Sequence, residues 1–255
     1  MNSCKLIGGL GNQMFQIATT QALALANNVE CCFADSYTPN QGNNALSYRD
    51  TIFNKVYLTE KVIRAGYHCK EPHFTYNPLP FEDMMVLSGY FQSPKYFDKY
   101  RNEILDLFLW KEKVDKIKND LVELLKNSVS LHVRRGDYIG NPNLEVLGRE
   151  YYYLAEKYIF ENGGFDNLLI FSDDIPWARE NFPKDAIYIR NLEDYEEMYL
   201  MSLCNHNIIA NSSFSWWGAY LNKNPEKIVT APKKWFKEGS GLSSKDIYTN
   251  KMIVI

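Results

Sequence analysis

The second half of the chain repeats one order of hydrophobic and polar positions. Residues 129–133 alternate between apolar and polar side chains, which predicts a short β-strand. Further apolar runs predict strands over 168–171, 186–189, 207–210 and 227–230. Amphipathic segments between them predict helices over 149–161, 176–182, 194–204 and 214–222. Strands and helices that alternate with short connections predict an α/β fold, in which a parallel sheet carries helices on both faces.

The first half shows a less regular pattern of the same type. Residues 4–7 and 29–33 predict two strands, and the Ala-, Leu- and Gln-rich segment from about 13 to 26 predicts a helix between them. The polar segment 37–50 and the irregular, aromatic-rich segment 67–83 predict long loops. Long loops in compact domains are more often functional than idle.

Two amphipathic helices are expected next, over 95–108 and 114–127. We place a domain boundary after the second helix, because the regular alternation of strands and helices begins there. The expected domains are therefore 1–127 and 128–255.

Composition limits the range of partners. The chain has 255 residues, which is enough for two compact domains of about 120 residues each. Its net charge of −3 argues against a protein that binds nucleic acid through phosphate neutralisation, so no nucleic-acid partner is expected. Aromatic residues make up 15%, which suits a polar, ring-shaped ligand and suits a tyrosine-rich core equally well.

The cysteines and the amino terminus indicate a reducing location. The five cysteines are odd in number and show no C-x-x-C spacing, so neither a zinc site nor a disulfide framework is expected. The amino terminus lacks the long apolar core of a secretory signal, and no stretch approaches the ~20 apolar residues of a membrane helix. We expect a cytoplasmic protein.

Polar groups follow three of the predicted strands. The groups are Arg134, Arg135 and Asp137 after the first strand, Asp173 and Asp174 after the second, and Ser212 and Ser213 after the fourth. Parallel strands would bring all three sets to one edge of the sheet. Arginine presents a planar fork that matches two phosphate oxygens, and serines that open a helix offer hydroxyl and N–H groups to an anion. The ordinary alternatives are a surface ion pair and helix capping.

Asp173 and Asp174 could form a metal-binding pair, but neighbouring side chains point in opposite directions. At most one of them is expected to face a ligand, where a carboxylate can accept the paired N–H groups of guanine. The alternative is a cap for the helix that begins near Pro176. We expect no metal site.

The glycine-rich start, Gly9-Leu10-Gly11, invites comparison with a dinucleotide-binding loop. The third glycine of G-x-G-x-x-G would fall at position 14, which is Met14, and Asp35 is poorly placed to bind a ribose. An NAD-dependent enzyme is therefore the weaker hypothesis. The ordinary role for Asn12 is to cap a helix that starts at Gln13.

Five motifs resemble those of the α-1,2-fucosyltransferases of glycosyltransferase family 11. They are GGLGNQMFQ at 8–16, GYFQSPKYF at 89–97, HVRRGDY at 132–138, FSDD at 171–174 and NSSFSWWGAYL at 211–221. The resemblance implies a GT-B type fold, in which two Rossmann-like domains face a central cleft. It also implies inverting transfer of L-fucose from GDP-β-L-fucose to the 2-hydroxyl of a terminal β-galactoside, without a metal or other cofactor. The carboxyl-terminal domain would bind GDP-fucose, and the amino-terminal domain would contact the acceptor.

The resemblance also assigns roles to residues. Arg134 would hold the β-phosphate of the leaving GDP, and Arg135 would support the loop or pair with an acid. Asn12 would hydrogen-bond near the fucose or the attacking hydroxyl. The remaining donor-side residues implied are Gly9, Gly11, His132, Asp137, Asp173, Asp174, Ser212, Ser213 and Phe214.

A general base is not identified, and Asp137, Glu145 and Glu150 are candidates by proximity alone. A non-catalytic protein that binds glycans or nucleotide sugars is the rival hypothesis. It is disfavoured because a degenerate transferase would be expected to have lost a charged motif residue, and all five motifs are intact. The acceptor is expected to be a β-galactoside oligosaccharide or a lipid-linked glycan, with segment 67–83 suited to stacking on sugars.

A lysine cluster near the carboxyl terminus has two interpretations. It comprises Lys223, Lys227, Lys233, Lys234 and Lys237, around Trp235 and Phe236. We favour a solvated basic face, because each lysine near an anionic membrane adds only ~1 kcal/mol. The alternative is weak peripheral contact at the inner membrane face, which would suit an enzyme that modifies a lipid-linked glycan.

Overall fold

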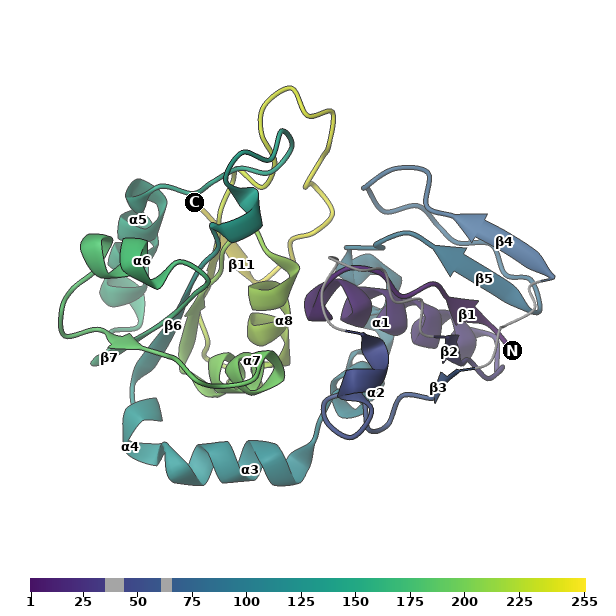
Figure 1. Cartoon of the computed structure of the whole chain (residues 1–255), viewed down its shortest axis with the longest axis horizontal. Coiled ribbons are helices and arrows are strands. Elements are labelled where there is room, and N and C mark those ends of the chain that lie inside the picture. Colours follow the sequence, from purple (N-terminus) through teal and green to yellow (C-terminus); the bar gives the residue numbers. More distant parts are fainter. Residues whose placement is uncertain (35–43, 61–65) are drawn as a thin grey trace. The chain divides into compact units, whose positions relative to one another are not determined.

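The computed structural model describes residues 1–34, 44–60 and 66–255 (Figure 1). Contacts between residues divide the chain into two compact units. Unit 1 comprises Met1–Lys111 and Ser243–Tyr248, and unit 2 comprises Glu112–Leu242 and Thr249–Ile255. Each unit is α/β and contains parallel strands, so the α/β part of the predicted fold class is confirmed.

Unit 2 is built on a six-stranded sheet in which all neighbouring strands run parallel. Its strands are β6 (Ser128–Val133), β7 (Asn167–Ser172), β8 (Ile187–Tyr188), β9 (His206–Ile208), β10 (Val229–Ala231) and β11 (Met252–Val254). Their order across the sheet is β11-β10-β9-β6-β7-β8. The chain moves outward from β6 to β8 and then returns to place β9 on the other side of β6. Ligands of open parallel sheets bind beyond the carboxyl ends of the strands at such a change of direction.

Four helices cover this sheet. They are α5 (Arg149–Asn162), α6 (Ile175–Asn181), α7 (Asp194–Leu203) and α8 (Ser213–Leu221). Figure 1 shows α5 and α6 on one face and α7 and α8 on the other. The predicted strands and helices of the second half are confirmed, with small shifts at their ends. Strand β11 was not predicted.

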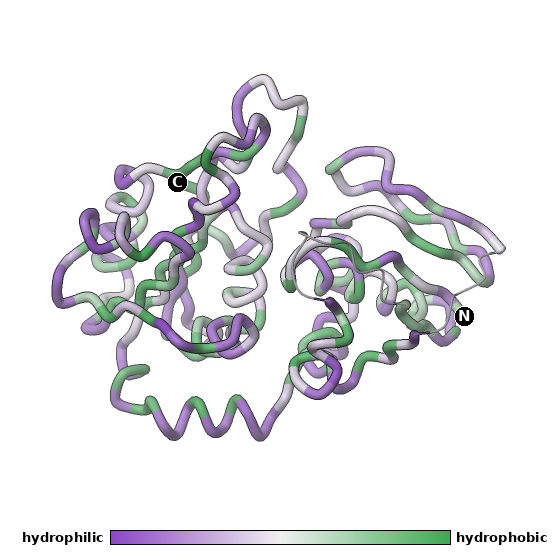
Figure 2. The backbone as a smooth tube through the Cα atoms, in the orientation of Figure 1, coloured by the Kyte–Doolittle hydropathy of each residue, from purple (hydrophilic) through white to green (hydrophobic). Residues whose placement is uncertain are grey.

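Strand β6 lies at the centre of unit 2, and all of its residues are buried. Figure 2 shows hydrophobic stretches interleaved with hydrophilic ones along the chain of this unit. One hydrophobic core contains the odd-numbered residues of β6 and residues of α5, namely Val129, Leu131, Val133, Tyr152, Ala155 and Ile159. Because side chains alternate along a strand, Ser130 and His132 face the opposite side of the sheet. There, Asn207 donates its side-chain N–H to Ser130 Oγ over 2.7 Å.

The compact units divide after Lys111, whereas the sequence predicts a boundary after residue 127. The intervening helices, α3 (Lys111–Asp120) and α4 (Val122–Leu125), belong almost entirely to unit 2. An ion pair between Lys113 and Glu196 joins α3 to α7, which explains why this segment groups with the second unit. The division into an acceptor and a donor domain stays a prediction.

Unit 1 has shorter elements. Its strands are β1 (Ser3–Cys4), β2 (Phe33–Ala34), β3 (Leu58–Thr59), β4 (Tyr67–Lys70) and β5 (Met85–Ser88). They form one sheet in the order β1-β5-β4 and a separate pair of β2 with β3, all parallel. Its helices are α1 (Leu10–Ala26) and α2 (Arg101–Leu107), together with the 3₁₀ turns Ala45–Tyr48, Pro94–Tyr96 and Asp98–Tyr100.

Several predictions for unit 1 were wrong in detail. Segment 67–83 is not a loop throughout, because β4 occupies its start. The helix predicted over 95–108 is two 3₁₀ turns followed by α2, because the backbone leaves the helical conformation at Phe97, where φ is −137° and ψ is −5°. Helix α1 begins at Leu10 instead of Gln13, with Gly9 as its extended N-cap residue. Residues 37–43 of the predicted loop lie outside the described residues.

Candidate functional site

Three loops meet at the carboxyl edge of the sheet in unit 2. Strand β6 pairs with β7 on one side and with β9 on the other, so the residues that follow these three strands are neighbours. Tyr138 Oη, from the loop after β6, donates a hydrogen bond to the carbonyl oxygen of Asn211, which follows β9. The expected meeting of these polar groups at one edge is therefore observed, next to the change of direction between β6 and β9.

Arg134 is held by carboxylates from two loops. Its Nη2 lies 2.6 Å from Asp137 Oδ1, and its Nη1 lies 3.0 Å from Asp173 Oδ2. The guanidinium carbon also lies 5.4 Å from the ring centroid of Tyr138. One third of the Arg134 side chain is exposed, so a fixed cation reaches the surface at the edge of the sheet.

Arg135 has a different position. Its Nε pairs with Asp174 Oδ2 at 2.9 Å, and its guanidinium carbon lies 4.3 Å from the ring centroid of Trp177. The side chain is only 18% exposed. Arg135 therefore pairs with an acid, which is one of the two roles expected for it.

The adjacent aspartates are held by different partners. Asp173 accepts the backbone N–H of Arg135 over 2.9 Å as well as pairing with Arg134. Asp174 accepts the backbone N–H of Trp177 over 3.1 Å and so caps α6, which was the ordinary alternative. This hydrogen bond, followed by the one from Arg135, lowers the pKa of Asp174. Asp173 and Asp174 thus pair with different arginines.

Gly136 allows the loop after β6 to approach β7 closely. A Cβ atom at this position would lie 2.7 Å from Asp173 Oδ2. A side chain here would displace the carboxylate that holds Arg134. The glycine of the HVRRGDY motif therefore has a steric role.

His132 lies beneath this edge and is buried. Its ring centroid lies 5.5 Å from that of Phe214 on α8. Burial, and then the charge of Arg134, lowers the pKa of His132 to about 3, so the ring is neutral near pH 7. Its Nδ1 has no hydrogen-bond partner among the described residues, and buried polar atoms in that state call for an explanation, such as a ligand.

The start of α8 forms the third part of the edge. Ser212 accepts the backbone N–H of Phe214 over 3.3 Å and caps the helix, while Ser213 is the first helical residue. Asn211 donates to the carbonyl oxygens of Glu145 and Trp235, which fixes the approach to the helix. A helix N-terminus favours an anion through its N–H groups and its dipole.

Gly9, Gly11 and Asn12 belong to unit 1, whereas the other predicted site residues belong to unit 2. Asn12 does not cap α1, as the ordinary alternative had it, because it lies inside the first turn. Its Oδ1 instead accepts a hydrogen bond from Gln92 Nε2 over 2.6 Å. Gln92 was not among the predicted site residues, although the GYFQSPKYF motif contains it.

The general base stays unidentified. Asp137 is committed to Arg134, while Glu145 and Glu150 line a pocket beside the start of α5. Trp177, which packs on Arg135, was also missed by the sequence analysis. The available signal was its position in the first turn of the predicted helix, three residues after the capping candidate Asp174.

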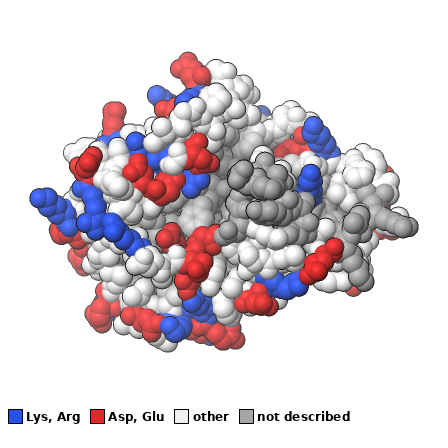
Figure 3. All heavy atoms as spheres, viewed as in Figure 1, with Lys and Arg blue, Asp and Glu red and all other residues white. Residues whose placement is uncertain are grey.

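The lysine cluster is smaller than the sequence indicates. Lys227 Nζ donates to the carbonyl oxygens of Ala219 and Asn222, and Lys237 Nζ donates to that of Asn141. Trp235 is buried and offers no ring to a membrane. Figure 3 shows basic and acidic side chains interleaved over the face in view.

Two further searches cover the described part of the chain. Within it, no three His, Cys, Asp or Glu side chains come together as possible ligands of a metal ion. No helix in the same residues has both the length and the apolar character needed to cross a membrane.

The arrangement of a fixed arginine, a neutral histidine and a helix N-terminus at one sheet edge suits an anionic ligand. The sequence profile of glycosyl transferase family 11 matches residues 1–253. The chain belongs to this family. The predicted resemblance is thus confirmed.

Three relatives illustrate the range of family 11. The O-antigen biosynthesis glycosyltransferase WbnK of Escherichia coli is 34% identical, over 92% of this chain and 95% of its own. An alpha-1,2-colitosyltransferase of Escherichia coli is 30% identical over 98% and 97%. Galactoside alpha-(1,2)-fucosyltransferase 2 of Hylobates lar is 29% identical over 84% and 67%.

A solved structure extends the likeness of this family 11 chain to its fold. The fucosyltransferase NodZ from Bradyrhizobium superposes with a TM-score of 0.52, over 86% of this chain and 92% of its own. Sequence identity is 11%, so the likeness concerns the fold, which is GT-B-like.

Arg134→Lys should strongly reduce turnover of this family 11 enzyme. Lysine keeps the charge but removes the planar fork that reaches both Asp137 and Asp173. By analogy with lost oxyanion donors, we expect kcat to fall by ~10²-fold or more. Steady-state assays of GDP release measure this. Arg179→Lys, on the exposed surface of α6, is the matched control and should leave kcat unchanged; near-normal activity of Arg134→Lys would contradict a phosphate role.

Proposed function

We propose that this protein is a galactoside 2-α-L-fucosyltransferase. It transfers L-fucose from GDP-β-L-fucose to the 2-hydroxyl of a terminal β-galactoside and inverts the anomeric configuration. Membership of family 11 and the names of the relatives support glycosyl transfer of this type. The GT-B arrangement, with unit 2 binding the donor and unit 1 contacting the acceptor, is part of the proposal.

The observation that carries this proposal is Arg134 at the carboxyl end of β6. Its guanidinium is fixed by Asp137 and Asp173, next to the strand that leads to the N-terminus of α8. A diphosphate bound here would meet a permanent cation and a helix N-terminus together. His132 Nδ1 supplies a buried polar atom for the same ligand.

The proposed chemistry uses these groups during departure of GDP. The acceptor oxygen attacks the anomeric carbon from the face opposite the diphosphate, so a β-linked donor gives an α-linked product. Negative charge grows on the leaving diphosphate as the glycosidic bond breaks. A cation fixed at that oxygen stabilises the transition state more than the ground state, and so increases kcat.

A second donor deserves a direct comparison. The relative that covers 98% of this chain is named an alpha-1,2-colitosyltransferase, which favours a nucleotide-activated colitose as the alternative donor. Both hypotheses share the α-1,2 linkage, and they differ in the sugar that is transferred.

The function is tested by mixing the protein with GDP-fucose and lactose. We expect release of GDP and a trisaccharide whose NMR spectrum shows an α-linked fucose on the 2-oxygen of galactose. Parallel reactions use nucleotide-activated colitose and a panel of β-galactosides, including a lipid-linked glycan. Turnover of colitose alone would replace fucose as the donor. Binding of GDP-fucose with no turnover of either donor on any acceptor would favour the non-catalytic hypothesis.

Transfer should not require a divalent metal. Asp173 and Asp174 are held by different arginines, and Arg134 supplies the positive charge that a metal would otherwise provide. We expect full activity in excess EDTA, measured as GDP release. Complete loss of activity that Mn²⁺ or Mg²⁺ restores would contradict this mechanism.

A cytoplasmic location is part of the proposal, and weak peripheral contact at the inner membrane face is the alternative to a solvated basic face. Lys233 and Lys234 are exposed and would carry that contact, at ~1 kcal/mol each. Co-sedimentation with anionic vesicles should be weak at low salt and absent at high salt. It should also be lost in Lys233→Glu/Lys234→Glu; equal sedimentation of that variant would remove these residues from the contact.

A further inference from the structure

Gln92 donates a hydrogen bond to the side chain of Asn12. Gln92 Nε2 donates to Asn12 Oδ1 over 2.6 Å, and Gln92 is 91% buried. With its oxygen engaged by Gln92, the Asn12 carboxamide has its nitrogen on the other side, above the backbone of Gly8. A carboxamide nitrogen can only donate hydrogen bonds, whereas its oxygen can only accept them.

The turn that carries Gln92 is held by a partly buried carboxylate. Glu71 accepts the backbone N–H groups of Tyr90 and Phe91 over 2.7 and 3.0 Å. Phe91 has a φ of +52°, which is rare for a bulky residue and persists only where surrounding contacts enforce it. Gly89 makes the contact with Glu71 possible, because a Cβ atom there would lie 2.3 Å from Glu71 Cβ.

The same turn is attached to α1 at a second point. Gln16 Nε2 donates to the carbonyl oxygen of Gly89 over 3.1 Å. Gln16 and Asn12 are four residues apart and lie on the same face of the helix. Two hydrogen bonds therefore fix the turn against α1, and the one from Gln92 ends on Asn12.

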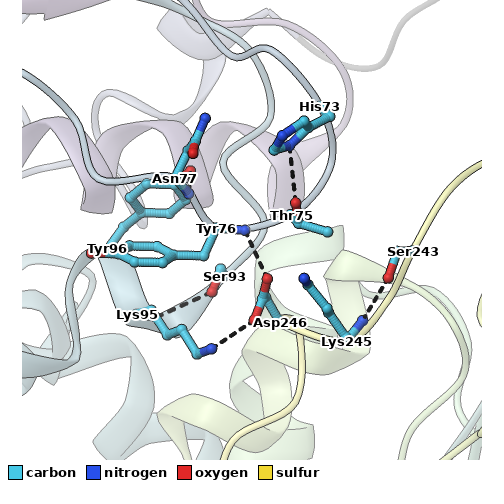
Figure 4. Close-up of polar contacts among 10 residues, drawn as sticks. All are labelled: His73, Thr75, Tyr76, Asn77, Ser93, Lys95, Tyr96, Ser243, Lys245 and Asp246. Atoms are coloured by element: carbon cyan, nitrogen blue, oxygen red, sulfur yellow. Dashed lines mark hydrogen bonds and ion pairs between the residues drawn. The ribbon is translucent and has the colours of Figure 1, made fainter.

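The segment is also fixed beyond Gln92 (Figure 4). Ser93 Oγ accepts the backbone N–H of Lys95, and Lys95 Nζ lies 2.6 Å from Asp246 Oδ1. Tyr96 Oη accepts the backbone N–H of Asn77 over 3.0 Å. The backbone is therefore held by hydrogen bonds on both sides of Gln92. A fixed backbone allows the Gln92 side chain to hold the Asn12 carboxamide in one orientation.

We infer that Gln92 is a positioning residue for glycosyl transfer, which orients the carboxamide of Asn12 so that its nitrogen serves the sugar substrates as a hydrogen-bond donor. This inference rests on the proposed role of Asn12 near the fucose or the attacking hydroxyl. It deepens that role, because a donating nitrogen recognises an oxygen lone pair and cannot accept the proton of the attacking hydroxyl. The proton of that hydroxyl must then go to another group of the protein or directly to water.

Four variants test the inference. Gln92→Met removes the donor while keeping the length of the side chain, and Gln92→Glu replaces the donor with an acceptor. We expect each to reduce kcat/KM by roughly tenfold or more, the factor for about one lost hydrogen bond. The kcat/KM of Asn12→Ala should fall at least as much. The kcat/KM of the double variant Asn12→Ala/Gln92→Met should equal that of Asn12→Ala. Gln21→Glu, also on α1 but bonded to Cys31, is the matched control and should keep wild-type kcat/KM.

The outcomes separate the inference from the proposed function. Normal kcat/KM in both Gln92 variants, with Asn12→Ala impaired, would overturn the inference alone. If Gln92→Glu is active and Gln92→Met is impaired, the Asn12 nitrogen donates to residue 92. That orientation is the opposite of the one inferred and would overturn the inference. Additive losses in the double variant would show that Gln92 acts independently of Asn12 and would also overturn it. Normal activity of Asn12→Ala would remove Asn12 from the proposed mechanism and, with it, the inference.

A readout that does not depend on activity completes the test. In protein labelled with ¹⁵N-asparagine, the side-chain amide signal of Asn12 is assigned by its loss in Asn12→Ala. It should shift in Gln92→Met and stay in place in Gln21→Glu. An unchanged signal in Gln92→Met would contradict the hydrogen bond itself, whether or not the protein transfers fucose. Thermal unfolding midpoints of all variants identify any loss that comes from unfolding.

Discussion

The parallel pairing of β6 with both β7 and β9 is the constraint on which the candidate site depends. It brings the ends of three strands to one edge, although the residues concerned are as far apart in sequence as Arg134 and Ser212. A buried central strand cannot slip in register without moving its hydrophobic side chains to the wrong face. The points at which the loops with the arginines and the aspartates leave the sheet, and the start of α8, therefore follow from the packing of unit 2.

Ion pairs at this edge make the two arginines differ in accessibility. Two arginines meet three aspartates, and each arginine has its own set of partners. Asp174 uses its carboxylate on Arg135 and on the cap of α6, so it stabilises the loop. Arg134 is shared between an exposed and a less exposed carboxylate, which leaves it as the more accessible of the two cations.

Much of unit 2 could be predicted from the sequence, because its strands are buried and its helices are amphipathic. The polar ends of β6, β7 and β9 were readable for the same reason. Strand β4 was missed because most of its residues are exposed, so no hydrophobic run marks it. Strands β1, β2 and β3 have two residues each, which is too short for periodicity to reveal their ends. The hydrogen bond between Gln92 and Asn12 joins residues 80 apart, and no local pattern signals such a contact.

The path of the chain has a consequence for folding during synthesis. Residues 243–248 complete unit 1, where Asp246 accepts the backbone N–H of Tyr76, 170 residues earlier, and pairs with Lys95. At ~5–20 residues per second, roughly 10 to 30 seconds separate the synthesis of Tyr76 from that of Asp246. Until then Lys95 and the Tyr76 amide lack this partner, so the unit that is made first is completed only when synthesis reaches residue 248. Unit 2, which is nearly continuous in sequence, can form its core while the earlier unit still waits for six residues from the far end of the chain.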